Sequence, residues 1–152
     1  MKFFFVFSIF LTFMFREGMT HIIPLSLNGQ TAANDSMPFM FGNFVDDYGL
    51  RYRVDDSLWI QQPSIKYHII RWNKAGQYII AKNDDRNPTD AGLYTRIDYM
   101  QLKGMEPWAW GFCYTEFKAK TDSAAETVAG PDRKNPKKGC NGFPFSRMKR
   151  VE

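Results

Sequence analysis

Few residues of this 152-residue chain have the types and spacing that catalysis requires. His68 is the one histidine in the part of the chain that we expect to fold. A catalytic histidine needs a nucleophile or an orienting carboxylate within hydrogen-bond reach. A hydrolase that uses His68 and an aspartate is therefore one hypothesis. A histidine with a structural hydrogen bond on a strand is the interpretation that we favour, so we assign no catalytic residue and expect a protein that is not an enzyme.

Adjacent aspartates at 46–47, 55–56 and 84–85 invite a calcium or glycosidase interpretation. The loop from Asp85 to Gly92 comes nearest to a calcium-binding loop, but its sixth position is not glycine and its twelfth is not glutamate. Adjacent aspartates in turns are more often solvated turn formers. The two cysteines and two histidines have no spacing typical of a zinc site. We therefore predict neither a metal nor another cofactor.

Aromatic residues are the feature that most suggests binding, at 16% of the chain. Aromatic side chains that line a concave β surface suit apolar molecules and the faces of sugars. The ligand-binding residues that we predict are Trp72, Tyr94, Trp108, Trp110 and Tyr114. The alternative is that these side chains belong to the core, as in a structural or surface-interaction protein without a ligand.

The stretch Lys66–Asp85 predicts the hairpin around which the other elements are organised. Alternation places its first three pairs of side chains on two faces: Tyr67, Ile69 and Arg71 on one, and His68, Ile70 and Trp72 on the other. Asn73–Gly76 is a polar turn in which glycine can supply a positive φ angle. Apolar residues occur on both faces, which indicates a strand pair inside a sheet or barrel wall.

Further strands are indicated by alternation at Gly49–Val54, Leu58–Gln62, Leu93–Leu102 and Trp108–Phe117. In the last of these, large aromatic residues alternate with small residues, which predicts a second face that meets something close. A capping box at Ser123–Glu126 then predicts a short helix. The fold that follows is all-β: an antiparallel meander, as in a small barrel, with one short C-terminal helix.

The amino terminus carries Lys2 followed by the apolar run Phe3–Phe15. A basic start and a short apolar core are typical of a secretory signal peptide, and the run is shorter than the roughly 20 residues of a membrane span. We predict a signal peptide at 1–20, cleaved between Thr20 and Ala33, then a linker at 21–40 and one domain at 41–152. The alternative is an uncleaved membrane anchor. A secreted or periplasmic location follows from the signal peptide.

Two cysteines are present, Cys113 and Cys140. In an exported chain, two cysteines most simply form one disulfide. The alternative is a pair of buried free thiols. The disulfide would pin the C-terminal segment to the Trp108–Phe117 strand.

The formal net charge is +4, a mild excess that does not by itself imply nucleic acid. Basic residues gather in the C-terminal segment from Arg133 to Arg150. This segment could contact an anionic surface, although a solubilising role is the interpretation that we favour. We expect a monomer that does not bind nucleic acid.

Gly42-Asn43-Phe44 lies near the start of the expected domain, where lipocalins carry Gly-x-Trp. With a leader, a meander of strands, a short helix and a closing segment that holds a cysteine, the chain resembles a lipocalin-type barrel from Phe41 to Met148. The resemblance implies an antiparallel barrel with an apolar ligand cavity. The leading hypothesis is therefore an exported, non-enzymatic binding protein for a small apolar molecule or a glycan.

Overall fold

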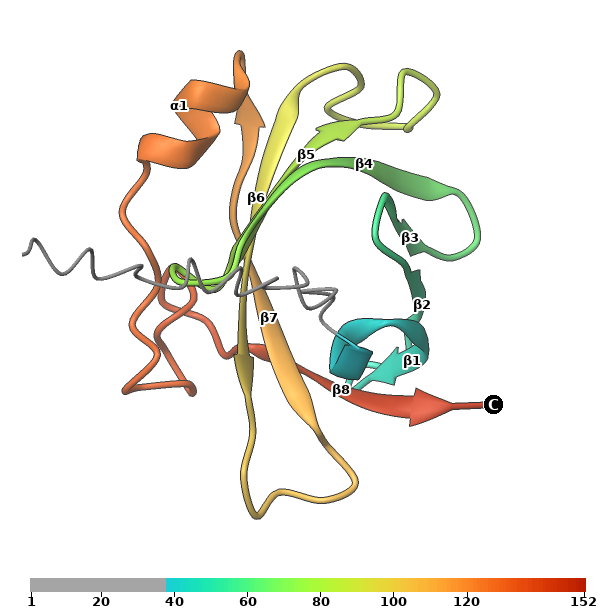
Figure 1. Cartoon of the computed structure of the whole chain (residues 1–152), viewed down its shortest axis with the longest axis vertical. Coiled ribbons are helices and arrows are strands. Elements are labelled where there is room, and N and C mark those ends of the chain that lie inside the picture. Colours follow the sequence, from blue (N-terminus) through green and yellow to red (C-terminus); the bar gives the residue numbers. More distant parts are fainter. Residues whose placement is uncertain (1–37) are drawn as a thin grey trace, which may run out of the picture. The chain divides into compact units, whose positions relative to one another are not determined.

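The computed structural model describes residues 38–152, which form a closed barrel of eight antiparallel strands (Figure 1). Each strand pairs with the next along the chain, and the first pairs with the last. The strands are β1 (Gly42–Asp46), β2 (Arg51–Val54), β3 (Leu58–Gln61), β4 (Ile65–Asn73), β5 (Tyr78–Asn83), β6 (Tyr94–Gln101), β7 (Trp110–Ala119) and β8 (Ser146–Val151). The predicted all-β meander with one short helix is confirmed. The predicted signal peptide and its cleavage site lie outside the described residues.

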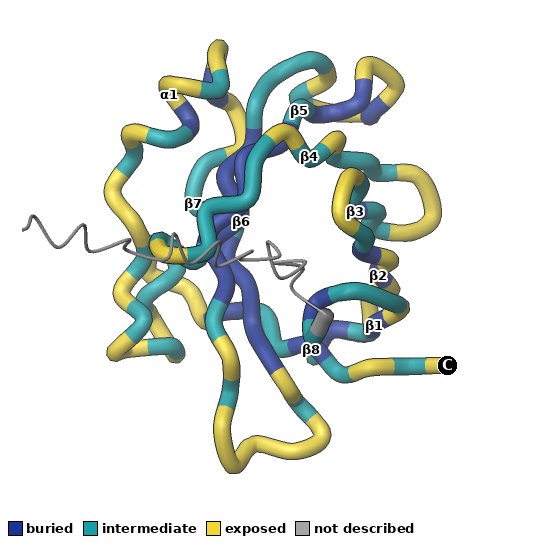
Figure 2. Tube along the Cα trace, viewed as in Figure 1, coloured by how far each residue is buried: buried dark blue, intermediate teal, exposed yellow. Residues whose placement is uncertain are grey.

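Alternation of side chains decides which face of each strand is buried. In β2 the two apolar side chains, Tyr52 and Val54, point into the barrel, and Arg51 and Arg53 are exposed. Strands β5 and β6 are buried on nearly every residue, because their outer faces are covered as well (Figure 2). These two strands therefore separate an interior core from a second, outer layer.

A β-bulge changes the phase of β4. The register with β5 shifts between Ile69 and Arg71, so that one extra residue is inserted there. Trp72 consequently packs against the interior core together with Tyr67 and Ile69, whereas Arg71 reaches an outer helix. Strict alternation predicted Trp72 on the opposite face from Tyr67. That prediction is wrong, because the bulge brings both side chains to the interior.

The turn after β4 also differs from the predicted one. Gln77 adopts the positive φ of 54° there, rather than Gly76. Gly76 is required for space instead, since a Cβ atom on it would lie 2.5 Å from the ring of Tyr78.

One end of the barrel, here called the capped end, is closed by the 3₁₀ helix η1 (Pro38–Met40). Phe39 packs edge-on against Tyr99 and Trp110, and Met40 is fully buried. The guanidinium of Arg150 lies 4.9 Å from the ring centroid of Phe44 and donates a hydrogen bond to the carbonyl of Phe39. Access to the interior from this end is therefore blocked.

Helix α1 (Asp122–Thr127) lies between β7 and β8 in the chain and covers the outer face of β5, β6 and β7 (Figure 1). It begins two residues earlier than the predicted capping box, because Thr121 is the N-cap in place of Ser123 and accepts a hydrogen bond from the amide of Ala124. Glu126 fixes the helix to the barrel by accepting hydrogen bonds from Arg71 and Tyr78.

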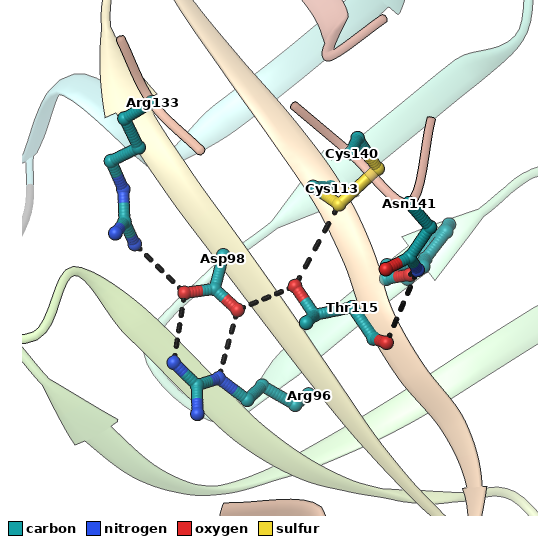
Figure 3. Close-up of a disulfide and its surroundings, with 8 residues drawn as sticks. Arg96, Asp98, Cys113, Thr115, Arg133, Cys140 and Asn141 are labelled. Atoms are coloured by element: carbon teal, nitrogen blue, oxygen red, sulfur yellow. Dashed lines mark hydrogen bonds and ion pairs between the residues drawn. A yellow bond between two sulfur atoms is a disulfide. The ribbon is translucent and has the colours of Figure 1, made fainter. Parts of the chain in front are cut away.

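A buried carboxylate, Asp98, organises the outer face of β6 (Figure 3). It accepts two hydrogen bonds from Arg96, one from Arg133 at 2.8 Å and one from the hydroxyl of Thr115 at 2.6 Å. Arg96 also donates to the carbonyls of Glu126 and Val128, which ties the end of α1 to the sheet. Asp98 thus binds two arginines that each hold a different outer segment.

The predicted Cys113–Cys140 disulfide is present beside this network (Figure 3). It joins the outer face of β7 to the segment that precedes β8, as the sequence predicted. The small residues of β7 were predicted to face a close neighbour. At Gly111 this is the case, since a Cβ atom there would lie 3.2 Å from the carbonyl oxygen of Ser146.

Removing the disulfide should lower the free energy of unfolding by about 3–4 kcal/mol, because the bridge closes a loop between residues 27 positions apart. The change is the double substitution Cys113→Ala and Cys140→Ala, measured by urea denaturation. Dithiothreitol should destabilise the wild-type chain by a similar amount and leave the double variant unaffected. Identical urea midpoints for the wild type and the double variant would contradict the prediction.

Candidate functional site

A pocket of about 310 Å³ opens at the end of the barrel opposite to η1, here called the pocket end. This end carries the turn between β3 and β4 and the long loop between β5 and β6. The pocket combines aromatic and aliphatic side chains with a polar wall from the loop. It is lined by Ile65, Tyr67, Asn83, Asn87, Thr89, Asp90, Tyr114 and Phe117. Its volume is at the lower limit for small-molecule sites, which suits a small ligand.

Two asparagines hold the β5–β6 loop in place. Asn87 bonds both the amide and the carbonyl of Lys66, which fixes the loop to β4. Asn83 donates to the carbonyls of Asp90 and Phe117 and accepts from the hydroxyl of Thr95. The amide groups of both asparagines are thus used to shape the loop. Thr89 and Asp90 are left as the polar side chains on the wall that can meet a ligand.

The middle of the barrel is filled by packed aromatic rings. Trp59 and Trp110 are fully buried with ring centroids 5.8 Å apart, and Phe112 lies 5.1 Å from Trp59. Tyr114 continues this column, 5.1 Å from Phe112, and reaches the pocket end, where its ring is 5.4 Å from that of Tyr67. The lipocalin resemblance implied an apolar cavity, whereas the hollow that these residues form lies at the mouth of the barrel.

The five residues predicted to bind a ligand do not lie together. Trp110 is in the central column and Trp72 is near the capped end, where its indole N–H donates to the carbonyl of Asp56. Tyr94 packs outside the barrel, in the cluster that contains Ala125 of α1. Tyr114 is the member that lines the pocket. Ligand binding by these residues stays a prediction.

Trp108 lies on the outer surface and does not share the face of Trp110. Its amide donates to the carbonyl of Met105, so it closes a turn before β7 begins at Trp110. Its ring is covered by Arg147 and Lys149, at 5.2 and 5.8 Å from the ring centroid. The predicted strand therefore starts two residues later than alternation suggested.

Sequence reasoning missed most of the pocket. Tyr67 was not among the residues predicted to bind a ligand. Its alternation with Ile69, which placed both side chains on one face of the strand, was a signal that could have identified it. Asn87, Thr89 and Asp90 belong to a stretch that was interpreted as a polar turn, and composition does not show that such a turn folds over a barrel mouth.

His68 and an aspartate do meet, on the outer surface. His68 Nε2 lies 2.8 Å from Asp84 Oδ2, and the histidine side chain is 53% exposed. The hydrogen bond from His68, followed by that from the amide of Arg86, holds the pKa of Asp84 well below its usual range. The shallow hollow around the pair is lined by His68, Lys82, Asn83, Asp84, Asp85 and Arg86, none of which is a serine, threonine or cysteine nucleophile.

Several basic residues of the C-terminal segment are engaged within the molecule. Arg133 bonds Asp98 and three backbone carbonyls, and Arg147 forms an ion pair with Asp47 at 2.8 Å. Lys137 lines an outer groove of about 550 Å³ whose walls include Met105 and Phe145. Contact of this segment with an anionic surface stays a prediction.

Interior tyrosines make a pH test possible. Burial raises the pKa of Tyr67, Tyr99 and Tyr114, that of Tyr99 to about 12. Burial, followed by the neighbouring Asp46 carboxylate, also raises the pKa of Tyr52. In the unfolded chain tyrosine ionises near pH 10, so the folded state binds more protons above that pH.

Stability should therefore be unaffected by these groups below pH 10 and should fall as the pH rises from about 10 through 12. Absorbance at 295 nm reports tyrosine ionisation, and near-ultraviolet circular dichroism reports packing of the aromatic core. We expect the interior tyrosines to ionise together with loss of the circular dichroism signal. Complete ionisation near pH 10 with an unchanged signal would contradict this prediction.

Among residues 38–152, no group of three or more histidine, cysteine, aspartate or glutamate side chains is placed to hold a metal ion. Within the same range, no helix is long and apolar enough to cross a bilayer. No protein-family model matches the chain, and the searches of curated proteins and of solved structures found no similar protein.

Proposed function

We propose that this protein is a non-enzymatic binding protein that holds one small molecule in the mouth of its barrel. The observation that carries the proposal is the pocket at the pocket end, where the ring of Tyr114 emerges from the packed core opposite a loop fixed by Asn83 and Asn87. A rigid aromatic floor with a few polar groups on one wall is the usual composition of a small-molecule site.

The candidate ligands are a small apolar molecule or a single sugar ring. The aromatic column fills the barrel below Tyr114, so a long acyl chain has no room to descend into the interior. The closed eight-stranded antiparallel meander supports the lipocalin-like interpretation, with the ligand at the mouth and not deep inside.

A thermal-shift and fluorescence screen of small aromatics, short fatty acids and monosaccharides tests the proposal. Binding to the native state alone raises the melting temperature by mass action. Tyr114→Ala should abolish the shift produced by a hit, and Trp108→Ala, outside the pocket, should preserve it. If no compound shifts either signal, or if Trp108→Ala and Tyr114→Ala act alike, the proposal fails.

The His68–Asp84 hydrogen bond is the one observation that favours a hydrolase. The hollow beside it offers no serine, threonine or cysteine nucleophile, and its mouth is wide, so water is not excluded from it. The binding function is therefore the better supported of the two. His68→Gln should leave ligand binding intact in the same screen.

Export of the protein is also part of the proposal. The disulfide supports it, because structural disulfides persist in oxidising compartments such as the periplasm and the extracellular space. The Lys2 start and the Phe3–Phe15 run supply the matching sequence signal.

A further inference from the structure

The pocket has a net negative lining. Asp90 is its one ionisable carboxylate, and none of the eight lining residues is lysine or arginine. None of the ion pairs among the described residues uses Asp90. A ligand carboxylate would therefore face a like charge without a compensating cation, whereas a ligand cation would find its partner in the pocket.

Three aromatic rings accompany this carboxylate, from Tyr67, Tyr114 and Phe117. The faces of aromatic rings attract cations, and cages of aromatic side chains are a common way to bind ammonium groups. Phe117 already accepts one cation from outside the pocket, since Lys118 Nζ lies 5.1 Å from its ring centroid. The rings and the carboxylate thus favour the same ligand charge.

Asp90 is held in place before any ligand arrives. Its backbone has a φ of 54°, in the left-handed region that aspartate and asparagine adopt more readily than other non-glycine residues. Its carbonyl accepts hydrogen bonds from Asn83 Nδ2 and from the amide of Leu93. The backbone that carries the carboxylate is thus already positioned, so less ordering is needed on binding, which favours affinity.

From these contacts we propose that the ligand of the pocket is a small organic cation, with an ammonium group near Asp90 and an apolar body against Tyr67, Tyr114 and Phe117. This inference rests on the proposed function and specifies the class of its ligand. Neutral sugars and carboxylic acids then become the weaker candidates for the same pocket.

Three probes of nearly equal size separate the ligand classes at neutral pH. They are 2-phenylethylamine, which is cationic, 2-phenylethanol, which is neutral, and 3-phenylpropionate, which is anionic. Titration calorimetry on the folded, disulfide-bonded protein should give the tightest binding for the amine and the weakest for the carboxylate. Raising the salt concentration should weaken binding of the amine and leave binding of the alcohol unchanged, because the contact of the amine with Asp90 is partly solvated.

Matched variants test the role of the charge. Asp90→Asn keeps the shape and the tolerance for a positive φ, and should weaken amine binding by about tenfold while leaving the alcohol unchanged. Asp85→Asn, in the same loop but outside the pocket lining, should leave both unchanged. Lys118→Ala removes a like charge that lies over the ring of Phe117 and should tighten amine binding.

The outcomes distinguish this inference from the function on which it rests. If the amine and the alcohol bind with equal affinity, and Asp90→Asn changes neither, the cation proposal is overturned and the binding function is retained. If 3-phenylpropionate binds most tightly, the cation proposal is likewise overturned and the binding function is retained. Failure of all three probes would overturn the cation proposal, and the broader screen with Tyr114→Ala would then decide whether the pocket binds any ligand.

Discussion

Trp110→Ala should lower the free energy of unfolding by about 3–5 kcal/mol, the range typical of large aromatic side chains removed from a core. Trp110 is 0% exposed, and its ring contacts those of Phe39, Phe44, Trp59 and Phe112. The substitution would leave a cavity where η1, β1, β3 and β7 meet. Urea denaturation followed by circular dichroism measures the change.

The natural control is Trp108→Ala, which removes the same side chain two residues earlier. Trp108 lies outside the barrel under Arg147 and Lys149, so its removal should cost about 1 kcal/mol or less. Trp110→Phe should fall between the two, because the indole N–H of Trp110 has no hydrogen-bond partner among the described residues. Equal losses for the two alanine variants would show that Trp110 is not part of the core.

Period-two alternation predicted the segments that form β2 to β7, because the interior of a small barrel is apolar and its outer surface meets water. Strand β2, with Tyr52 and Val54 buried between exposed arginines, shows this most simply. Alternation did not predict β1 or β8, whose pairing closes the barrel. The disulfide followed from counting two cysteines in a chain with an export signal, and it was confirmed.

Alternation predicted the wrong face for side chains where the backbone departs from the two-residue repeat of a regular strand. The bulge after Ile69 moves Trp72 to the interior, and the turn closed by Trp108 removes that residue from β7. The bulge depends on the register with β5, which the sequence of β4 alone does not show, whereas the turn before β7 had a local signal in Gly104 and Pro107. The face of an aromatic residue near a strand end is therefore the least predictable property of this chain.

The pocket was harder to predict for a different reason. Its aromatic floor comes from β4 and β7, and its polar wall comes from the loop that contains Asp90. These segments meet only because the barrel closes, and a contact between segments so far apart in the chain cannot be predicted from one sequence. Asp98 was hidden in the same way, because its partner Arg133 lies 35 residues further along the chain.

Asp98→Ala should destabilise the protein by about 3–5 kcal/mol, the cost expected when one partner of a buried ion pair is removed. Asp98 is 0% exposed and Arg96 is 8% exposed, so the arginine would keep a buried charge without its counter-ion. Arg133 would lose the same partner while still bound to the carbonyls of Gly76, Gln77 and Tyr99. The urea midpoint measures the loss of stability.

Hydrogen exchange should locate the effect, with faster exchange in α1 and in residues 131–145, because Arg96 and Arg133 hold these segments through Asp98. Asp85→Ala is the matched control. Asp85 is 80% exposed and lies 3.7 Å from Lys82, so its loss should cost about 1 kcal/mol or less. If both variants shift the urea midpoint equally, or if Asp98→Ala leaves exchange in α1 unchanged, then Asp98 does not hold the outer layer on the barrel.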